Sequence, residues 1–235
     1  MLVTLLTTTA LLLLSPRAPR TSACPPPLPY PNTTLPVNAT LPTPEPATIP
    51  ISVCQYVYPS TIYELNSLYP TNASDPTHFF QVIHQVNQTS SFRLQVAAQV
   101  QFVNIPAIGL TPCRLELVLP NSKLSRLAGP APLFNIFAVE RAPGTEATWE
   151  TFEARESVAK ANIVGAVNGS QDSLEQSRAE NGGVLKITER ECNETLTFQM
   201  AMVEPKTAPW INYWDWVEVS PPAAPAQGFR VVFGC

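Results

Sequence analysis

The amino-acid sequence predicts an all-β protein, an antiparallel β-sandwich preceded by a disordered Pro-rich segment. Apolar and polar residues alternate with a period of two in several stretches, which is the period of a strand with one buried face. Turns that contain Pro and Asn separate these stretches at short intervals, as is typical of a sandwich. Ten Pro residues lie between Cys24 and Pro50, ahead of the first such stretch.

The chain begins with an apolar leader at residues 1–14, which has the length of a signal-peptide core and is too short to span a bilayer. We expect residues 1–23 to be a signal peptide, because Thr21, Ser22 and Ala23 resemble a cleavage site. The leader lacks a basic residue near Met1, which leaves an uncleaved anchor as the alternative. No later window holds 18 apolar residues, so no transmembrane helix is expected in the mature chain.

Residues 24–50 are interpreted as a Pro- and Thr-rich linker. Pro fixes φ and removes a backbone donor, so this stretch can neither join a sheet nor continue a helix, and it should be extended. The sequence predicts that the linker is glycosylated, with an unmodified disordered tail as the alternative. Residues 51–235 remain for one domain with a single core.

The clearest alternation covers residues 91–103, where a strand with one buried face is expected. Its apolar positions alternate with polar or small ones and are Phe92, Leu94, Val96, Ala98, Val100 and Phe102. The same pattern predicts strands at residues 113–119 and 196–202. Shorter strands are expected at residues 55–63, 78–86, 133–140, 158–167, 184–188, 212–219 and 228–233. Residues 171–180 resemble a helix but are polar throughout, and they are interpreted as a loop insertion.

Six Asn-x-Ser/Thr triplets, none with Pro in the middle position, predict N-glycosylation and therefore secretion. Two lie in the linker and four lie between predicted strands; the residues are Asn32, Asn38, Asn72, Asn87, Asn168 and Asn193. The expected location is extracellular, with association to a cell wall left open. A binding face should lie where no glycan is attached, and the region around residues 210–219 is one such place.

Five cysteines should form disulfides in an oxidising lumen. We expect Cys113 to pair with Cys192, and Cys54 with Cys235, which would tie the ends of the domain together. Cys24 is then free, linked to another chain, or a competitor for Cys54, and the sequence leaves the connectivity open.

Composition and motifs argue against several functions. Only 14% of the residues are charged and the net charge is −4, so nucleic-acid binding has no electrostatic support. No Cys-x-x-Cys or His-Glu-x-x-His motif predicts a metal site, and no cofactor is expected. His78 and His84 are interpreted as structural or surface residues. A Gly-x-Ser-x-Gly elbow is missing, which disfavours a serine hydrolase of that type.

Acidic residues could still form the carboxylate pair of a glycoside hydrolase, although eighteen acids make such pairs inevitable. The candidates are Glu150, Glu153, Glu156, Asp215 and Glu218. A sharper candidate is the aromatic group Trp210, Trp214 and Trp216, which would share one face of a strand. Such rings can stack on sugars, so glycan contact is one interpretation; packing in the sandwich core is the other.

Several stretches resemble the fungal But-two (ubiquitin-3-binding protein) C-terminal domain family. They are FVNIP at residues 102–106, CRLELVLP at 113–120, VYP at 57–59, ECN at 191–193 and YWDW at 213–216. The resemblance covers about residues 51–235 and implies a fungal origin, a β-sandwich and a secreted protein of unassigned activity. It also implies that the aromatic residues are scaffold.

We therefore expect a secreted, non-enzymatic protein of the cell surface or wall that acts by binding or as a structural component. Its partner would be a wall glycan or an extracellular protein, and its oligomeric state is left open. A carbohydrate-binding module, a secreted enzyme such as a glycoside hydrolase, and a binder in the ubiquitin-like pathway are the alternatives.

Overall fold

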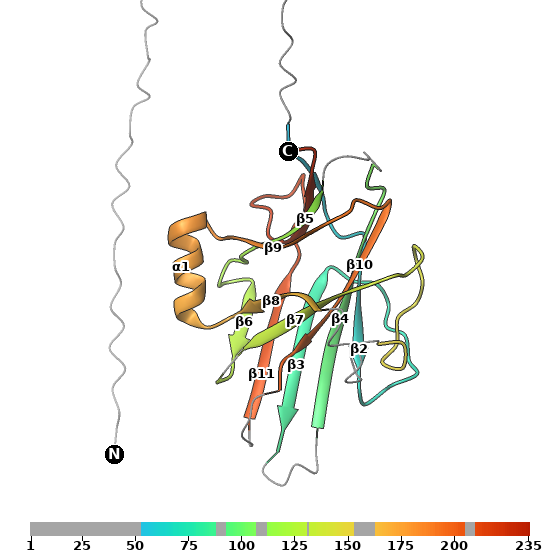
Figure 1. The fold of residues 1–235 in the computed structure, drawn as a ribbon. Helices are drawn as coiled ribbons and strands as arrows, with labels where there is room; N and C mark the ends of the chain where they lie inside the picture. The colour runs from blue at the N-terminus through green and yellow to red at the C-terminus, as the bar shows by residue number, and fades with distance from the viewer. Residues whose placement is uncertain (1–52, 88–92, 107–111, 131, 153–162, 205–209) are drawn as a thin grey trace, which may run out of the picture. The chain divides into compact units, whose positions relative to one another are not determined.

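The computed structural model describes residues 53–87, 93–106, 112–130, 132–152, 163–204 and 210–235 (Figure 1). The predicted leader and linker, with Cys24, Asn32 and Asn38, therefore lie outside the described residues, as do Glu153 and Glu156. The described chain folds into antiparallel strands with one short helix, which confirms the all-β prediction.

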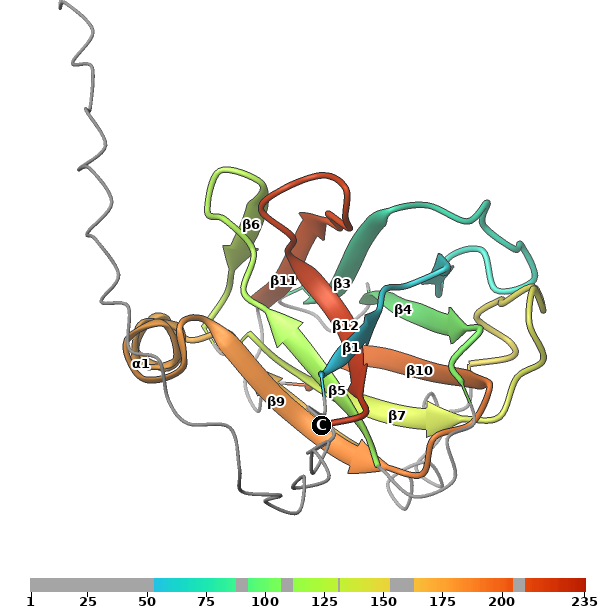
Figure 2. The ribbon, with the colours of Figure 1, turned by 90° about the horizontal axis from the view of Figure 1, so that it is seen from above.

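The strands form two sheets. The smaller sheet has four strands in the order β1-β12-β5-β9. The larger sheet has eight, in the order β6-β11-β3-β4-β10-β7-β8, with β2 paired to β4. The larger sheet curls and the smaller one packs across it, giving a sandwich-like half-barrel (Figures 1 and 2). The strands are β1 (Gln55–Val57), β2 (Thr61–Asn66), β3 (Phe79–Val86), β4 (Arg93–Val103), β5 (Cys113–Val118), β6 (Ser125–Ala128), β7 (Leu133–Val139), β8 (Ile163–Asn168), β9 (Val184–Arg190), β10 (Thr195–Met202), β11 (Trp210–Val217) and β12 (Gly228–Phe233).

Large aromatic side chains fill the space between the sheets. The rings of Phe80 and Trp216 stack with centroids 4.0 Å apart, and Phe229 from the smaller sheet meets Phe80 edge-on at 5.2 Å. Trp214 extends the cluster, with its ring 5.3 Å from Trp216 and 5.7 Å from Phe134. Large aromatic rings bury more apolar area per side chain than the aliphatic residues of the core, so their burial contributes most to stability. The end of β11 is therefore built into the core.

The strands differ from the sequence prediction in two places. The strand expected at residues 55–63 is two strands, since β1 joins the smaller sheet and β2 the larger one. Pro59 lies between them and has no backbone N–H to continue a ladder. Strand β6 was not predicted, because four residues are too few to show a period.

The interpretation of residues 171–180 as a loop is wrong, because α1 (Gln171–Asn181) is a helix. Hydrogen bonds link side chains four residues apart, from Gln171 to Glu175 and from Gln176 to Glu180. Gly182 ends the helix in the left-handed conformation, at φ 61°. Leu174 is the helix's buried apolar residue, so the helix docks without the apolar stripe that would have identified it.

Strand β4 is buried on both faces, not only on the apolar one. Its apolar side chains face the core, whereas Ala97, Gln99 and Gln101 are each 1% exposed. Phe152 and Ala147, from the segment after β7, pack with Ala97 in a second apolar cluster. The polar residues of the alternation therefore lie beneath a loop, which the sequence pattern alone does not distinguish from solvent.

Gln101 is satisfied by neighbouring groups, whereas Gln99 Nε2 has no hydrogen-bond partner among the described residues. The Gln199 amide donates to Gln99 Oε1 at 3.0 Å. The Gln101 amide donates to Thr197 Oγ1 at 3.0 Å and to the carbonyl of Ala142 at 3.1 Å, while Gln101 Oε1 accepts from the N–H of Gly144 at 3.0 Å. Gln101 thus fastens the segment after β7 to the sheet.

Disulfides join Cys54 to Cys235 and Cys113 to Cys192, the pairing that the sequence predicts. The first connects the residue before β1 with the second residue after β12, so it ties together the first and last strands of the described chain. The second connects the start of β5 to the turn between β9 and β10.

Replacing Gln101 with Ala should lower the free energy of unfolding by about 1–3 kcal/mol, because it leaves buried donors and acceptors without partners. Denaturant unfolding measures this loss, and hydrogen exchange should rise in residues 142–152. The control is Gln81→Ala on β3, a half-buried position where we expect a change within about 0.5 kcal/mol. Equal losses in the two variants would contradict the role given to Gln101.

Candidate ligand pocket and the buried acidic residues

A pocket of about 550 Å³ lies between β6 and α1, and we call it the α1 pocket. Ser125 and Leu127 of β6, the end strand of the larger sheet, line one wall, and Gln171, Leu174 and Arg178 of α1 line another. The volume is within the range of sites that hold small molecules.

Gly169 holds these walls close together. Its N–H donates to the carbonyl of Pro132 at 2.9 Å. A Cβ at this position would lie 2.8 Å from that oxygen and 3.0 Å from Cε3 of Trp214. Only a residue without a side chain lets the end of β8 approach β11 this closely, and α1 begins two residues later. The pocket therefore depends on this glycine.

Hydroxyl, amide and guanidinium groups supply the polar lining of the α1 pocket. Ser122, Ser125 and Ser170 bring hydroxyls, and Gln171 brings an amide. Among the described residues that line the pocket, Arg178 is the one charged residue. Hydrogen-bond donors together with an apolar floor suit a small polar ligand that is neutral or negatively charged.

The three candidate tryptophans are buried. Trp214 is 1% exposed, Trp216 is fully buried, and Trp210 is 8% exposed. Trp214 and Trp216 belong to the core between the sheets, and the edge of Trp214 also forms part of the α1 pocket. Trp210 packs edge-on against His84, with ring centroids 4.6 Å apart. These rings therefore do not form an open stacking platform: Trp214 and Trp216 are core residues, and Trp210 is buried against His84.

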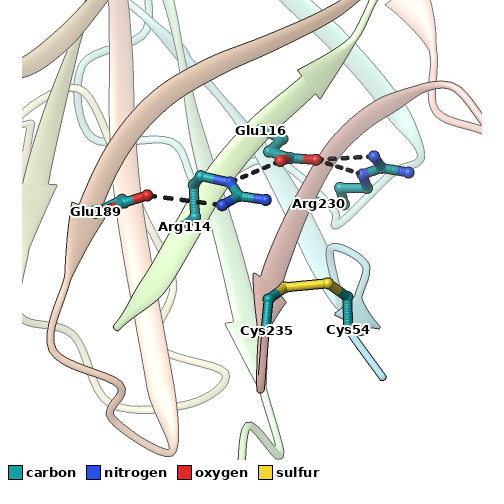
Figure 3. A network of polar contacts seen from close by, with 6 residues as sticks. All are labelled: Cys54, Arg114, Glu116, Glu189, Arg230 and Cys235. Carbon is teal, nitrogen blue, oxygen red and sulfur yellow. Dashed lines mark hydrogen bonds and ion pairs between the residues drawn. A yellow bond between two sulfur atoms is a disulfide. The ribbon is translucent and has the colours of Figure 1, made fainter. Parts of the chain in front are cut away.

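Glu116 is a buried acid on the face of the smaller sheet that points away from the core (Figure 3). Its Oε1 accepts from Arg114 Nε at 2.7 Å, and its Oε2 accepts from Arg230 Nη2 at 2.8 Å. Arg230 also lies over the ring of Tyr56, 4.6 Å from its centroid. Two guanidinium groups compensate the buried charge, which identifies Glu116 as a structural residue of this sheet.

Asp215, on the larger sheet, is likewise bound by an arginine. Its Oδ2 accepts from Arg126 Nη2 at 2.8 Å, and its Oδ1 accepts from Arg126 Nε at 3.1 Å. This two-point contact joins β11 to β6 and raises the pKa of Arg126. Asp215 therefore secures the short edge strand that lines the α1 pocket.

Glu218 lies in the core, just after β11. Both carboxyl oxygens accept from the N–H of Phe229 at 3.1 Å, and Oε1 accepts from Trp216 Nε1 at 3.1 Å. Gly228 has φ 97°, and a Cβ there would overlap this carboxyl. Burial raises the pKa of Glu218 to about 8, although the two donors favour the charged form. The side chain is therefore protonated at neutral pH.

The two histidines differ in exposure. His78 is exposed before β3, whereas His84 is 2% exposed within it. The Gln95 amide donates to His84 Nε2 at 2.8 Å, and burial lowers the pKa of His84. No cluster of three His, Cys, Asp or Glu side chains suited to a metal ion occurs in the described part of the chain.

Three candidate glycosylation residues are exposed: Asn72 in the turn after β2, Asn168 at the end of β8, and Asn193 before β10. Asn87 is half-buried directly after β3. Asn168 is the last residue of β8, so it lies within a strand and not between strands as predicted. In the described residues, no helix has the length and apolar character needed to cross a membrane.

Comparison with known proteins found no matching family model, curated protein or solved structure. The resemblance to the But-two family therefore stays a prediction.

Stability should fall as pH rises from about 5 to 8 because of Glu218. In this window the unfolded carboxyl is ionised, with a pKa near 4.5, while the folded one keeps its proton up to about pH 8. Unfolding therefore releases a proton, which costs the native state about 1.4 kcal/mol per pH unit.

Thermal unfolding of the wild type and Glu218→Gln across this pH range measures the effect. As pH rises, the melting temperature of Glu218→Gln should increase relative to that of the wild type. His84 acts in the opposite direction below its usual pKa but is common to both proteins. Glu150→Gln, at an exposed carboxyl, is the control and should follow the wild type. Parallel curves for the wild type and Glu218→Gln would refute the prediction.

Proposed function

We propose that this chain is a secreted, non-enzymatic glycoprotein that binds a ligand outside the cell, and that the α1 pocket is its binding site. The pocket carries the proposal: it combines a sizeable volume, an apolar floor and convergent donors. A member of the fungal But-two family, as the sequence motifs suggest, would be a wall or surface protein.

Several observations support the extracellular location. Two disulfides are typical of proteins that fold in an oxidising compartment. An apolar leader of this kind would direct a chain to that compartment, and the Asn of three Asn-x-Ser/Thr triplets is exposed. The same observations disfavour an intracellular binder in the ubiquitin-like pathway.

The placement of the acidic residues favours binding over hydrolysis. Glu116 and Asp215 are held by arginines, and Glu218 is enclosed in the core. Among the described residues, the lining of the α1 pocket includes neither a carboxylate nor a histidine. A glycoside hydrolase needs two carboxyl groups across one cleft, an arrangement that these residues do not provide.

A saccharide is the ligand class that best suits the lining. Sugars present hydroxyls to donors and acceptors such as Ser125, Ser170, Gln171 and Arg178. They also present an apolar C–H face, which Leu127 and the edge of Trp214 can contact. This makes a carbohydrate-binding module the most specific form of the proposal.

Glycan-array binding followed by calorimetry with β-glucan, chitin and mannan oligosaccharides tests the proposal. Gln171→Ala and Arg178→Ala, both at exposed positions of α1, should each weaken binding by about tenfold or more through lost hydrogen bonds. Their melting temperatures should stay close to that of the wild type.

Lys186→Ala removes an exposed cation on β9 and is the matched control, for which unchanged affinity is expected. Absence of binding by the wild type to all three oligosaccharide classes would refute the saccharide ligand. Unchanged affinity in both α1 variants would show that a different surface binds.

A further inference from the structure

A second pocket, of about 340 Å³, lies where β7 and β9 end and β10 begins. We call it the Asn193 pocket. Its lining includes Glu140, Arg141, Arg190, Asn193, Thr195 and Thr197. Figure 2 shows the connection from β9 to β10 passing the end of β7 on this side of the fold. Polar groups dominate the lining, in contrast to the mixed lining of the α1 pocket.

The pocket is built around a glycosylation triplet. Asn193 and Thr195 are the first and third residues of Asn193-Glu194-Thr195, and both line the pocket. Asn193 is exposed, so its side-chain nitrogen is open to modification. The disulfide of Cys192 to Cys113 on one side and the start of β10 on the other fix the backbone at this point. A glycan attached here begins at the wall of the pocket.

The groups around Asn193 match the first sugar of an N-linked glycan. Arg190 Nε is buried and has no hydrogen-bond acceptor among the described residues. Arg190 is half-buried and lines the pocket, so the rest of its guanidinium can donate to the N-acetyl carbonyl and the hydroxyls of N-acetylglucosamine. Glu140 lines the pocket and can accept from sugar hydroxyls; Arg141 also lines it and donates from Nη2 to the carbonyl of Thr151 at 2.6 Å.

We propose that the glycan on Asn193 folds back onto its own domain, with its first N-acetylglucosamine units seated in the Asn193 pocket. The glycan then acts as a structural part of the junction between β7, β9 and β10. Asn72 provides the contrast, because it lies in an exposed turn. The backbone N–H of Asn72 donates to the carbonyl of Tyr69 at 3.1 Å. A glycan there projects into solvent.

The test uses the full chain secreted from a eukaryotic host. Mass spectrometry measures occupancy at each Asn, and digestion with peptide-N-glycosidase then measures the rate of glycan release under native conditions. Release at Asn193 should be slower than at Asn72 by about tenfold or more, since the seated sugar must first leave the pocket. After denaturation the two rates should be alike. Asn193→Gln should lower the melting temperature, whereas Asn72→Gln should not.

Arg190→Met keeps the aliphatic stem of the side chain but removes its donors, and it should accelerate native release at Asn193 alone. Arg93→Met, at an exposed arginine of β4, is the matched control and should leave both rates unchanged. If Arg190→Met does not fold, the comparison of Asn193 with Asn72 in the wild type still decides.

Equal native rates at the two residues would overturn the proposal, as would occupancy at Asn72 with an unmodified Asn193. Lack of glycan at every Asn-x-Ser/Thr residue would overturn it together with the proposed secretory route. The α1 pocket does not enter this test, so failure of ligand binding there leaves the result intact.

Discussion

The burial of β4 on both faces is the constraint on which the rest of the structure depends. One face supplies the core between the sheets, through Val100, Phe102 and their neighbours. The other face carries glutamines that must find partners once they leave water, because an unsatisfied buried amide costs about as much as a lost hydrogen bond. Gln99 Oε1 accepts from Gln199 of β10, although Gln99 Nε2 has no partner among the described residues, and Gln101 bonds to the segment after β7. The central strand therefore dictates where an irregular segment lies.

A polar contact of the larger sheet holds a segment that lines each pocket. Gln101 binds the carbonyl of Ala142, which lines the Asn193 pocket together with Arg141. On the opposite edge of the larger sheet, Asp215 holds Arg126 and so fixes β6, the wall of the α1 pocket. Polar residues of β4 and β11 thus hold segments that line the two pockets, whereas the aromatic core lies between the sheets.

Much of the fold could be predicted from the sequence, and little of the sites could. Strands β4, β5 and β10 show a period of two because one face of each meets the core, whereas the disulfide pairing, although expected, is left open by the sequence and is given by the structure. Helix α1 escaped prediction because one leucine suffices to dock it, and β6 is too short to show a pattern. Both walls of the α1 pocket are therefore elements that periodicity does not reveal. Their approach depends on Gly169, whose role appears only when β8 and β11 are in place.

The glycosylation triplets are placed differently at the two pockets. Asn193 itself lines its pocket, so the first sugar of a glycan on Asn193 would lie directly at that pocket. At the α1 pocket only the second and third residues of the triplet, Gly169 and Ser170, line the wall, and Asn168 is exposed at the rim. Its Oδ1 accepts from the Ser170 N–H at 2.9 Å, which orients the side-chain nitrogen of Asn168 relative to α1. A glycan on Asn168 would begin beside the α1 pocket, which departs from the expectation that a binding face lies where no glycan is attached, and it would restrict the size of ligand admitted. A short saccharide fits that restriction better than a protein partner, because a protein would have to displace the glycan to reach Arg178.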